Sequence, residues 1–482
     1  MNKVRTRFAP SPTGYMHIGN LRTALYEYLV AKSEGGDFIL RIEDTDRSRY
    51  VEGAERVIYE TLKSVGLKHD EGPDIGGDYG PYVQSERRGG YLDYAKKLVE
   101  KGAAYYCFCE KSNADDEHAE SGHKDICRHL SEAEIHKNLS ENKPYVIRQK
   151  MPEGGSTSFS DLVFGEVAVE NKELEDQILI KSDGYPTYNF ANVIDDHEMN
   201  ITHVVRGCEY LSSTPKYNLL YEALGWQKPT YIHLPLIMGQ NEDGSVSKLS
   251  KRHGAVSFAD LVEMGYLPEA IINYIAFLGW CPESNREIFT LDELKREFSP
   301  KRISKSPAIF DYKKLDWFNS EYIRAKSEEE FLKIAEPYIN SAVKGADLDI
   351  SKIAALLKNR ISRLGEIGDM IDFFAELPDY DISLYTNKKS KTNPEISESV
   401  LIDIKARLGA LGDWNYDKLH DLLIGYGQEK ELKNGTVMWP VRIAVSGRAM
   451  TPGGAIEILE ILGKTESLRR IEKGIDMLKG ED

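Results

Sequence analysis

The sequence lacks any segment that would place the chain in or across a membrane. No stretch approaches the roughly 18 consecutive apolar residues that a membrane-spanning helix needs. The first residues also lack an apolar core behind a basic flank, which is the pattern of a secretory leader. Both absences predict a cytoplasmic protein without a membrane partner.

Cysteine is scarce. The chain has five cysteines in 482 residues, too few for a disulfide framework, so the thiols are expected to be reduced or to bind metal. Internal repeats, low-complexity tails and sustained heptads are missing as well, which excludes solenoid and coiled-coil architectures.

Positive charge is in deficit, with a formal net charge of −16. Such a balance argues against a general nucleic-acid coat, although binding depends on local surface and not on the total. The segment 301–314 is locally basic, because it carries five lysines and arginines against one aspartate. At 482 residues the chain exceeds one hydrophobic core, so several domains are expected. Nothing in the sequence indicates an obligate oligomer, and a monomer is expected.

The first functional pattern is the segment 7–20, which reads R-F-A-P-S-P-T-G-Y-M-H-I-G-N. A strand is predicted to end near Phe8, a proline and glycine turn follows, and a helix is predicted from Ile18. The first N–H groups of a helix are unpaired and carry partial positive charge, which suits a phosphate or carboxylate. His17 and Asn20 lie one turn apart at this helix entrance and can reach the same ligand. A capped turn with a surface histidine is the alternative on spacing alone.

An acidic group follows the second predicted strand, residues 38–42. Glu43, Asp44, Thr45 and Asp46 come at its carboxyl end, where open α/β sheets bind ligands. Glu43 is the residue expected to face a substrate ammonium. The aspartates fit a turn and helix-capping role better.

Four potential metal ligands fall in two short arms. Cys107 and Cys109 are separated by one residue, and Cys127 and His129 follow after an acidic segment. Three thiols and one imidazole can close a structural zinc tetrahedron. Buried reduced cysteines remain the alternative, because the spacing is tighter than in common zinc fingers.

Two further patterns follow the acidic and metal-binding ones. Tyr188 and Asn192 share one face of a predicted helix. Arg206 ends a predicted buried strand over 203–205, where its planar guanidinium can clamp a carboxylate. A surface salt bridge is the other interpretation of Arg206.

A lysine-rich loop comes after a predicted strand over 231–238. Lys248 and Lys251 follow a glycine-containing segment, and two such lysines can swing onto a triphosphate and neutralise its charge in the transition state. A solvated basic loop is the alternative. The later segment 301–306 is similar in letters but no predicted strand precedes it, so its lysines more plausibly meet nucleic-acid phosphates.

Taken together, these segments resemble the class I glutamyl-tRNA synthetases of bacteria. The segment 7–20 resembles their HIGH signature, 41–46 reads R-I-E-D-T-D, and 248–252 resembles their KMSKS loop. Asn20 departs from the signature, which has histidine there, so any stabilisation from this position must come from a neutral hydrogen bond.

The resemblance implies a role for each matching residue. It implies catalytic roles for His17, Asn20, Lys248 and Lys251. It implies ATP binding, with Mg²⁺, by Pro10, Gly14, His17, Gly19, Asn20, Glu209, Lys248 and Lys251. It implies L-glutamate binding by Arg7, Ser11, Glu43, Tyr188, Asn192 and Arg206. It also favours one structural Zn²⁺ at Cys107, Cys109, Cys127 and His129.

The resemblance also implies an α/β fold in which a Rossmann-like catalytic domain carries an inserted α+β domain and an all-helical anticodon-binding region follows. We expect the catalytic domain in residues 1–81 and 186–240, with the acceptor-end and zinc-binding insertion in 82–185. The KMSKS-loop and stem-contact domain is expected in 241–320 and the helical domains in 321–482. The implied activity is ligation of glutamate to tRNA(Glu), and possible charging of tRNA(Gln) stays open.

Three other functions fit parts of the sequence. A small-molecule nucleotidyltransferase could share the histidine signature but would not need a long helical C-terminal region. A paralogue that glutamylates a modified tRNA base would lack that region. A tRNA-binding protein without catalysis would not need His17, Lys248 and Lys251 together.

Overall fold

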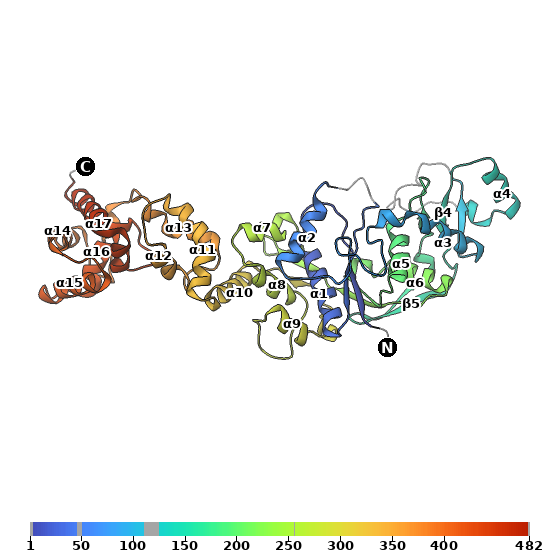
Figure 1. Ribbon diagram of the computed structural model, residues 1–482, viewed down its shortest axis with the longest axis horizontal. Coiled ribbons are helices and arrows are strands. Elements are labelled where there is room, and N and C mark those ends of the chain that lie inside the picture. The colour runs from blue at the N-terminus through green and yellow to red at the C-terminus, as the bar shows by residue number, and fades with distance from the viewer. Residues whose placement is uncertain (1–2, 46–50, 110–124, 255, 481–482) are drawn as a thin grey trace. The chain divides into compact units, whose positions relative to one another are not determined.

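The protein is described from a computed structural model, drawn as a ribbon in Figure 1. The structure describes residues 3–45, 51–109, 125–254 and 256–480, so Asp46 lies outside the described residues. The chain forms two compact units. One comprises residues 1–262 and 268–315, and the other comprises residues 263–267 and 316–482.

The centre of the first unit is built from two pairs of parallel strands. β1 (Arg5–Phe8) pairs with β2 (Asp37–Leu40), and β8 (His203–Gly207) pairs with β9 (Thr230–Leu234). The pairs adjoin where the Thr202 N–H donates to the Arg5 carbonyl at 3.0 Å. The strand order therefore changes direction between β1 and β8, and open α/β sheets bind ligands at such switch points.

Helix α1 (Ile18–Ser33) connects β1 to β2 and begins where the sequence predicts. Leu21, Leu25 and Leu29 predict one apolar face, but the helix is buried on nearly all sides because it packs against β1, β2, β8, α8 (Pro268–Ala276) and α9 (Leu291–Glu297). The other helices of this unit are α2 (Ala54–Ser64), α3 (Arg88–Glu100), α4 (Glu132–Ser140), α5 (Tyr188–Glu198), α6 (Thr214–Leu224), α7 (Phe258–Glu263), α8 (Pro268–Ala276) and α9 (Leu291–Glu297).

The segment between α3 and α5 contributes to two sheets. β3 (Ala104–Cys107), β4 (Val146–Gln149) and β7 (Ile178–Ile180) form an antiparallel sheet. The sequence pattern of residues 158–169 predicts one short β segment, and this prediction is wrong. It is a hairpin of β5 (Ser156–Asp161) and β6 (Gly165–Glu170), and β5 adjoins β9, so the hairpin extends the sheet that holds β8.

The turn of this hairpin has an identifiable cause. The Asp161 carboxylate accepts the N–H groups of Val163 and Phe164 at 2.9 and 2.8 Å, and Gly165 has a φ of +80°. A side chain that bonds the backbone two and three residues ahead closes a turn, and glycine adopts positive φ without strain.

The expected strand over 231–238 is interrupted at Pro235, so it forms the end of β9 and the start of β10 (Ile237–Gln240). β10 pairs antiparallel with β11 (Val246–Lys248) and parallel with β12 (Ala308–Ile309). A short sheet thus supports the lysine-rich loop on one side.

The second unit is helical, as the sequence predicts, and its described residues include no β-strand. Helical periodicity over residues 353–374 predicts one continuous helix there, and this prediction is wrong, because α12 ends at Leu357 and α13 starts only at Ile367. The helices that follow β12 are α10 (Tyr312–Ala325), α11 (Glu328–Val343), α12 (Ile350–Leu357), α13 (Ile367–Ile371), α14 (Pro394–Ala410), α15 (Tyr416–Glu429), α16 (Asn434–Ser446) and α17 (Ala455–Lys479).

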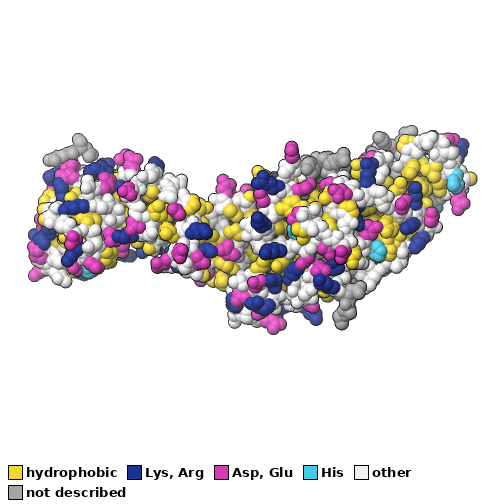
Figure 2. All heavy atoms as spheres, viewed as in Figure 1, with side chains coloured by type: hydrophobic (Ala, Val, Ile, Leu, Met, Phe, Trp, Pro, Cys, Tyr) yellow, Lys and Arg dark blue, Asp and Glu magenta, His cyan; other side chains and the backbone are white. Residues whose placement is uncertain are grey.

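Surface and hydropathy agree with the composition. Acidic and basic side chains are interspersed over the face drawn in Figure 2. Among the helices that the structure describes, none combines the length and the apolar character needed to cross a bilayer.

Candidate active site

The loop after β1 ends at His17, which caps α1. The His17 Nδ1 accepts the Gly19 N–H at 3.0 Å, so the proton of the neutral ring sits on Nε2. Burial, followed by the nearby charge of Lys248, lowers the pKa of His17. The histidine is therefore neutral near pH 7 and offers one N–H donor. Asn20 is exposed on the first turn of the same helix.

The two signature segments lie together although they are far apart in sequence. The Ile18 N–H donates to the Val256 carbonyl at 2.9 Å, and the Phe258 N–H donates to the Met16 carbonyl at 3.0 Å. Lys248 ends β11 and is exposed, and Lys251 starts a 3₁₀ turn over residues 251–253. This brings the first turn of α1 and the lysine-rich loop to one place.

His253 was not singled out from the sequence, yet it anchors this loop. Its Nδ1 accepts the Ser250 N–H at 3.1 Å, and its Nε2 lies 3.0 Å from the Asn241 Oδ1. A Cβ on Gly239 would stand 2.4 Å from the His253 ring, so glycine makes room for the histidine. A histidine that follows Lys251-Arg252 was the only sequence signal for it.

Arg7 lies in a buried cluster of balanced charges. Its Nε and Nη1 donate to Asp196 at 2.9 Å and to Glu27 at 3.2 Å. Arg41 shares Asp196 at 2.8 Å and donates to Glu43 at 2.9 Å. Burial alone would raise the pKa of Asp196, but the two guanidinium groups outweigh it and lower that pKa. We call these five residues the Arg7 cluster.

The acids of the Arg7 cluster differ in their protonation equilibria. Burial raises the pKa of Glu43, against the opposing charges of Arg41 and Arg7. Burial raises the pKa of Glu27 more strongly, and none of the described residues forms a hydrogen bond with the Glu27 Oε2. Sequence reasoning missed Glu27 and Asp196, because each lies inside a helix without a motif. It gave Arg41 no role, although Arg41 begins the R-I-E-D-T-D segment.

Arg206 ends β8 in different surroundings. The side chain is buried, its Nη2 donates to the Thr214 Oγ1 at 2.7 Å, and its Nε donates to the His233 Nε2 at 3.2 Å. The guanidinium carbon also lies 4.7 to 5.5 Å from the ring centroids of three tyrosines, namely Tyr210, Tyr217 and Tyr231.

The charge of Arg206 has no carboxylate within ion-pair distance in the part of the chain that the structure describes. Its Nη1 is also without a hydrogen-bond partner there and is not enclosed. Guanidinium over aromatic faces gains some stabilisation, but a buried charge still favours an anionic partner. We call Arg206 with Thr214, His233 and the three tyrosines the Arg206 cluster.

The remaining expected glutamate-binding residues lie around these clusters. Tyr188 opens α5, and burial followed by the charge of Glu43 raises its pKa, so its hydroxyl stays protonated. Its ring lies 6.0 Å from the ring of Tyr210. Asn192, one turn later, donates to the Tyr188 carbonyl at 2.8 Å. Ser11 is half-buried in the loop after β1.

The expected ATP-binding residues Pro10, Gly14 and Gly19 lie in that same loop and at the start of α1. Gly14 has a φ of +122°, a backbone conformation that residues with a side chain rarely adopt. Glu209 is exposed in the 3₁₀ turn directly after β8.

Three of the four expected metal ligands converge. The sulfur atoms of Cys107, Cys109 and Cys127 lie within 4.8 Å of one another, and those of Cys109 and Cys127 are 3.6 Å apart. Zinc bonds of about 2.3 Å in a tetrahedron set sulfur atoms about 3.8 Å apart, so the spacing fits zinc. The Phe108 N–H donates to the Cys127 sulfur at 3.3 Å, which suits a thiolate. His129 is exposed and lies outside this cluster of thiols.

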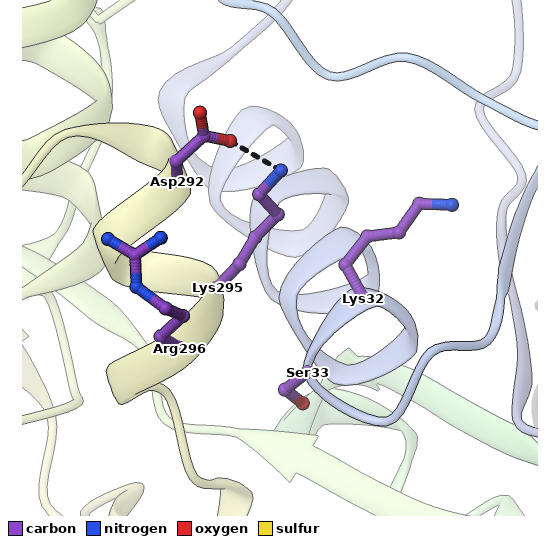
Figure 3. Close-up of a pocket in the computed structure, with 5 residues that line it drawn as sticks. All are labelled: Lys32, Ser33, Asp292, Lys295 and Arg296. Atoms are coloured by element: carbon purple, nitrogen blue, oxygen red, sulfur yellow. Dashed lines mark ion pairs between the residues drawn. The ribbon is translucent and has the colours of Figure 1, made fainter.

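A separate open pocket lies between the end of α1 and α9 and is lined by Lys32, Ser33, Asp292, Lys295 and Arg296 (Figure 3). Lys295 points toward Asp292 and pairs with it at 2.5 Å, and Lys32 pairs with Asp70 at 2.6 Å. The pocket shares no residue with the expected site, and acids already neutralise its two lysines.

Comparisons with known proteins agree with this geometry. Residues 3–317 match the family of class I tRNA synthetases (E and Q), catalytic domain, and residues 330–475 match an anticodon binding domain. The chain is 58% identical to a glutamate–tRNA ligase of Clostridium kluyveri over 100% of this chain and 99% of that protein. It is 56% identical to the corresponding ligase of Clostridium acetobutylicum over 99% of both chains.

Solved structures give the same answer. A glutamate tRNA ligase from Elizabethkingia meningosepticum, in complex with its amino acid, superposes with a TM-score of 0.89 at 38% identity, covering 99% of this chain and 100% of that one. Glutamate-tRNA synthetase from Elizabethkingia anophelis gives a TM-score of 0.88 at 37% identity, covering 98% and 100%. The full-length identity, the matched catalytic family and the shared fold together establish that this chain belongs to the class I glutamate–tRNA ligases.

Proposed function

We propose that the chain makes glutamyl-adenylate from glutamate and ATP at the carboxyl ends of β1 and β8, then transfers the glutamyl group to the terminal adenosine of tRNA. The substrate α-carboxylate itself attacks the α-phosphorus and pyrophosphate leaves, so the protein needs no nucleophilic side chain. Its contribution is positioning and electrostatic stabilisation.

The uncompensated charge of Arg206 carries the proposal for glutamate. A side-chain carboxylate can accept from its free Nη1 and from Nη2, whereas the amide of glutamine would bring no charge and one mismatched donor. Glu43 would meet the substrate ammonium, although it also accepts from Arg41. Arg7, Ser11, Tyr188 and Asn192 would complete the glutamate pocket.

The phosphates of ATP would lie between the two signature segments. The neutral His17 would donate from Nε2, and Asn20 would add a second neutral donor. Lys248 and Lys251 would supply positive charge that stabilises the negative charge building on the phosphate oxygens in the transition state. Pro10, Gly14, Gly19 and Glu209 would bind the rest of the nucleotide. Mg²⁺ would enter with ATP and neutralise part of its charge.

We also propose one structural zinc at Cys107, Cys109 and Cys127, with His129 as the fourth ligand after a movement of its exposed side chain. The ion would stabilise the fold of this region and leave no open position for chemistry. Metal analysis of the purified protein should find one zinc per chain, and C127S should lose it.

The partner is tRNA(Glu), and tRNA(Gln) is a candidate second substrate that charging of each purified tRNA would reveal. We propose that residues 82–185 contact the acceptor end, that 241–320 contact the stem and that 321–482 read the anticodon. Residues 1–81 and 186–240 would then form the catalytic domain proper. One chain supplies every proposed catalytic residue, which is compatible with action as a monomer, and we propose that the protein works in the cytoplasm like an ordinary tRNA ligase.

Pyrophosphate exchange tests the glutamate assignment. Arg206→Leu should raise the KM for glutamate about 30-fold, the effect of losing roughly 2 kcal/mol, and leave the KM for ATP nearly unchanged. Arg88→Leu is the matched control, because it removes an exposed arginine that bonds Tyr185. An unchanged glutamate KM in Arg206→Leu would exclude Arg206 from the site.

A further inference from the structure

A buried histidine and aspartate lie directly behind Arg206. The His233 ring on β9 and the Asp161 carboxylate at the end of β5 are both buried. The Asp161 Oδ2 lies 2.6 Å from the ring Nδ1 of His233 and also accepts the backbone N–H of His233 at 3.0 Å. The opposite ring nitrogen, Nε2, accepts from the Arg206 Nε at 3.2 Å.

The hydrogen bonds define one arrangement of protons. Asp161 is held ionised because bonds from His233, Phe164 and Val163 outweigh its burial and lower its pKa. Burial lowers the pKa of His233, so the ring is neutral and its single proton bonds Asp161 from Nδ1. The lone pair on Nε2 therefore faces Arg206.

Thr214 completes the shell around the guanidinium. Its hydroxyl oxygen accepts from the Arg206 Nη2 at 2.7 Å and lies 2.7 Å from the Tyr210 carbonyl, to which it donates. Neutral acceptors thus hold the Nε and one side of Nη2 without cancelling the charge of Arg206. Nη1 and the other hydrogen of Nη2 stay available for a ligand carboxylate.

We propose that Asp161 and His233 are positioning residues that set the glutamate specificity of this ligase by fixing the tautomer of His233 and, through it, the orientation of Arg206. The inference rests on the proposed function, in which Arg206 binds the substrate carboxylate. Asp161 can influence Arg206 although it does not contact it. The hairpin of β5 and β6 joins the sheet of β8 and β9, so Asp161 lies beside His233 on β9.

The chemistry of Asp161→Asn makes the proposal specific. An amide NH₂ toward His233 would donate where the native carboxylate accepts, so the ring would carry its proton on Nε2. That proton would face the Arg206 N–H, and two donors repel. If the amide oxygen faced His233 instead, its NH₂ would oppose the N–H groups of Val163 and Phe164. The first arrangement disturbs Arg206 directly, and the second disturbs the turn that places residue 161, and neither changes the size of that residue.

The experiment is a set of glutamate and ATP KM values from pyrophosphate exchange, for Asp161→Asn and His233→Phe, each alone and combined with Arg206→Leu. Each single variant should raise the glutamate KM about tenfold, the effect of one hydrogen bond to a charged group, and leave the ATP KM unchanged. When combined with Arg206→Leu, neither substitution should raise the glutamate KM further, because the guanidinium that Asp161 and His233 orient is gone. His203→Phe, on β8 and bonded to Thr202, is the matched control.

Each outcome has one meaning. A folded Asp161→Asn protein with the parent glutamate KM would overturn the inference, as would equal increases on both backgrounds. If His233→Phe fails to fold, Asp161→Asn alone and Asp161→Asn combined with Arg206→Leu still test the positioning role. If Arg206→Leu alone leaves the glutamate KM unchanged, the proposed function fails, and this result is separate from failure of the positioning role.

Discussion

The Arg7 cluster and the Arg206 cluster treat a buried arginine in opposite ways. Arg7 and Arg41 contact Glu27, Glu43 and Asp196, so the fold itself balances their charges. Arg206 is held by a histidine, a threonine and tyrosine rings, and the described residues give it no carboxylate. The arginines of the first cluster are paired with carboxylates of the fold, whereas we propose that a substrate carboxylate pairs with the arginine of the second.

This difference separates a structural from a ligand-binding arginine better than sequence position does. Both arginines lie near the carboxyl end of a strand, and both fit the family pattern. A guanidinium that already holds two carboxylates gains little from a third, whereas one with a free edge and no counter-ion gains a strong, charge-assisted bond. We therefore expect Arg206 to set selectivity and Arg7 mainly to order the pocket.

The largest expected effect is on stability in the Arg7 cluster. Asp196→Ala leaves two buried guanidinium groups without their shared partner and should lower the unfolding free energy by about 3–5 kcal/mol. Denaturant unfolding of the parent and the variant measures it. Asp183→Ala, an exposed aspartate at a turn, is the control. A loss below about 1 kcal/mol would mean that the cluster is not held as a unit.

The next effect extends the comparison to the lysine-rich loop. Lys251 has no carboxylate within ion-pair distance among the described residues, so its charge is available to ATP. Lys251→Ala should reduce the rate of adenylate formation about 10²- to 10³-fold and leave stability unchanged. Lys301→Ala, an exposed lysine in the similar segment 301–306, should be nearly silent. The reverse pattern would place the catalytic loop on the later segment.

The smallest expected effect is a pH dependence of the unfolding free energy that comes from Glu27 in the Arg7 cluster. Burial raises the folded-state pKa of Glu27 above its unfolded value, so between these two values the folded protein binds more protons. The unfolding free energy therefore falls as pH rises above about 4.5, by about 1.4 kcal/mol for each unit by which the pKa is raised. Glu27→Gln lacks this decline, so its stability relative to the parent should improve from pH 4.5 to 8. A constant difference over that range would show that Glu27 is already ionised at pH 4.5.

Much of the architecture was predictable, because the signals were local. The strand, turn and helix of residues 5–33 follow from an alternating segment, a proline and glycine turn and a helical period, and the helical C-terminal region follows from its periodicity. The fold class and the family were confirmed. The residue assignments at the site stay predictions, although the structure brings His17 and Lys248 together and buries Arg206 without a carboxylate partner among the described residues.

The rest depends on contacts between distant segments. Glu27 and Arg41 sit inside a helix and a strand end, where a charged residue is usually solvated, and only the packed sheet shows that Asp196 joins them. Asp161 lies in a segment expected to be one strand, so its turn and its bond to His233 were invisible. His129 shows the limit of spacing, because an adjacent sequence position does not guarantee that a side chain points at the thiols.

The most direct test of the account measures thermal unfolding with and without glutamate for the parent and for Arg206→Leu. Removing an unbalanced buried charge should leave the free variant at least as stable as the parent. Glutamate at 100 times the parent's Kd should stabilise the parent by about 2.7 kcal/mol and the variant, which binds it about 30-fold more weakly, by only about 0.9 kcal/mol. An Arg206→Leu protein that is destabilised by several kcal/mol and that glutamate stabilises as much as the parent would show that Arg206 is structural, and would contradict the account.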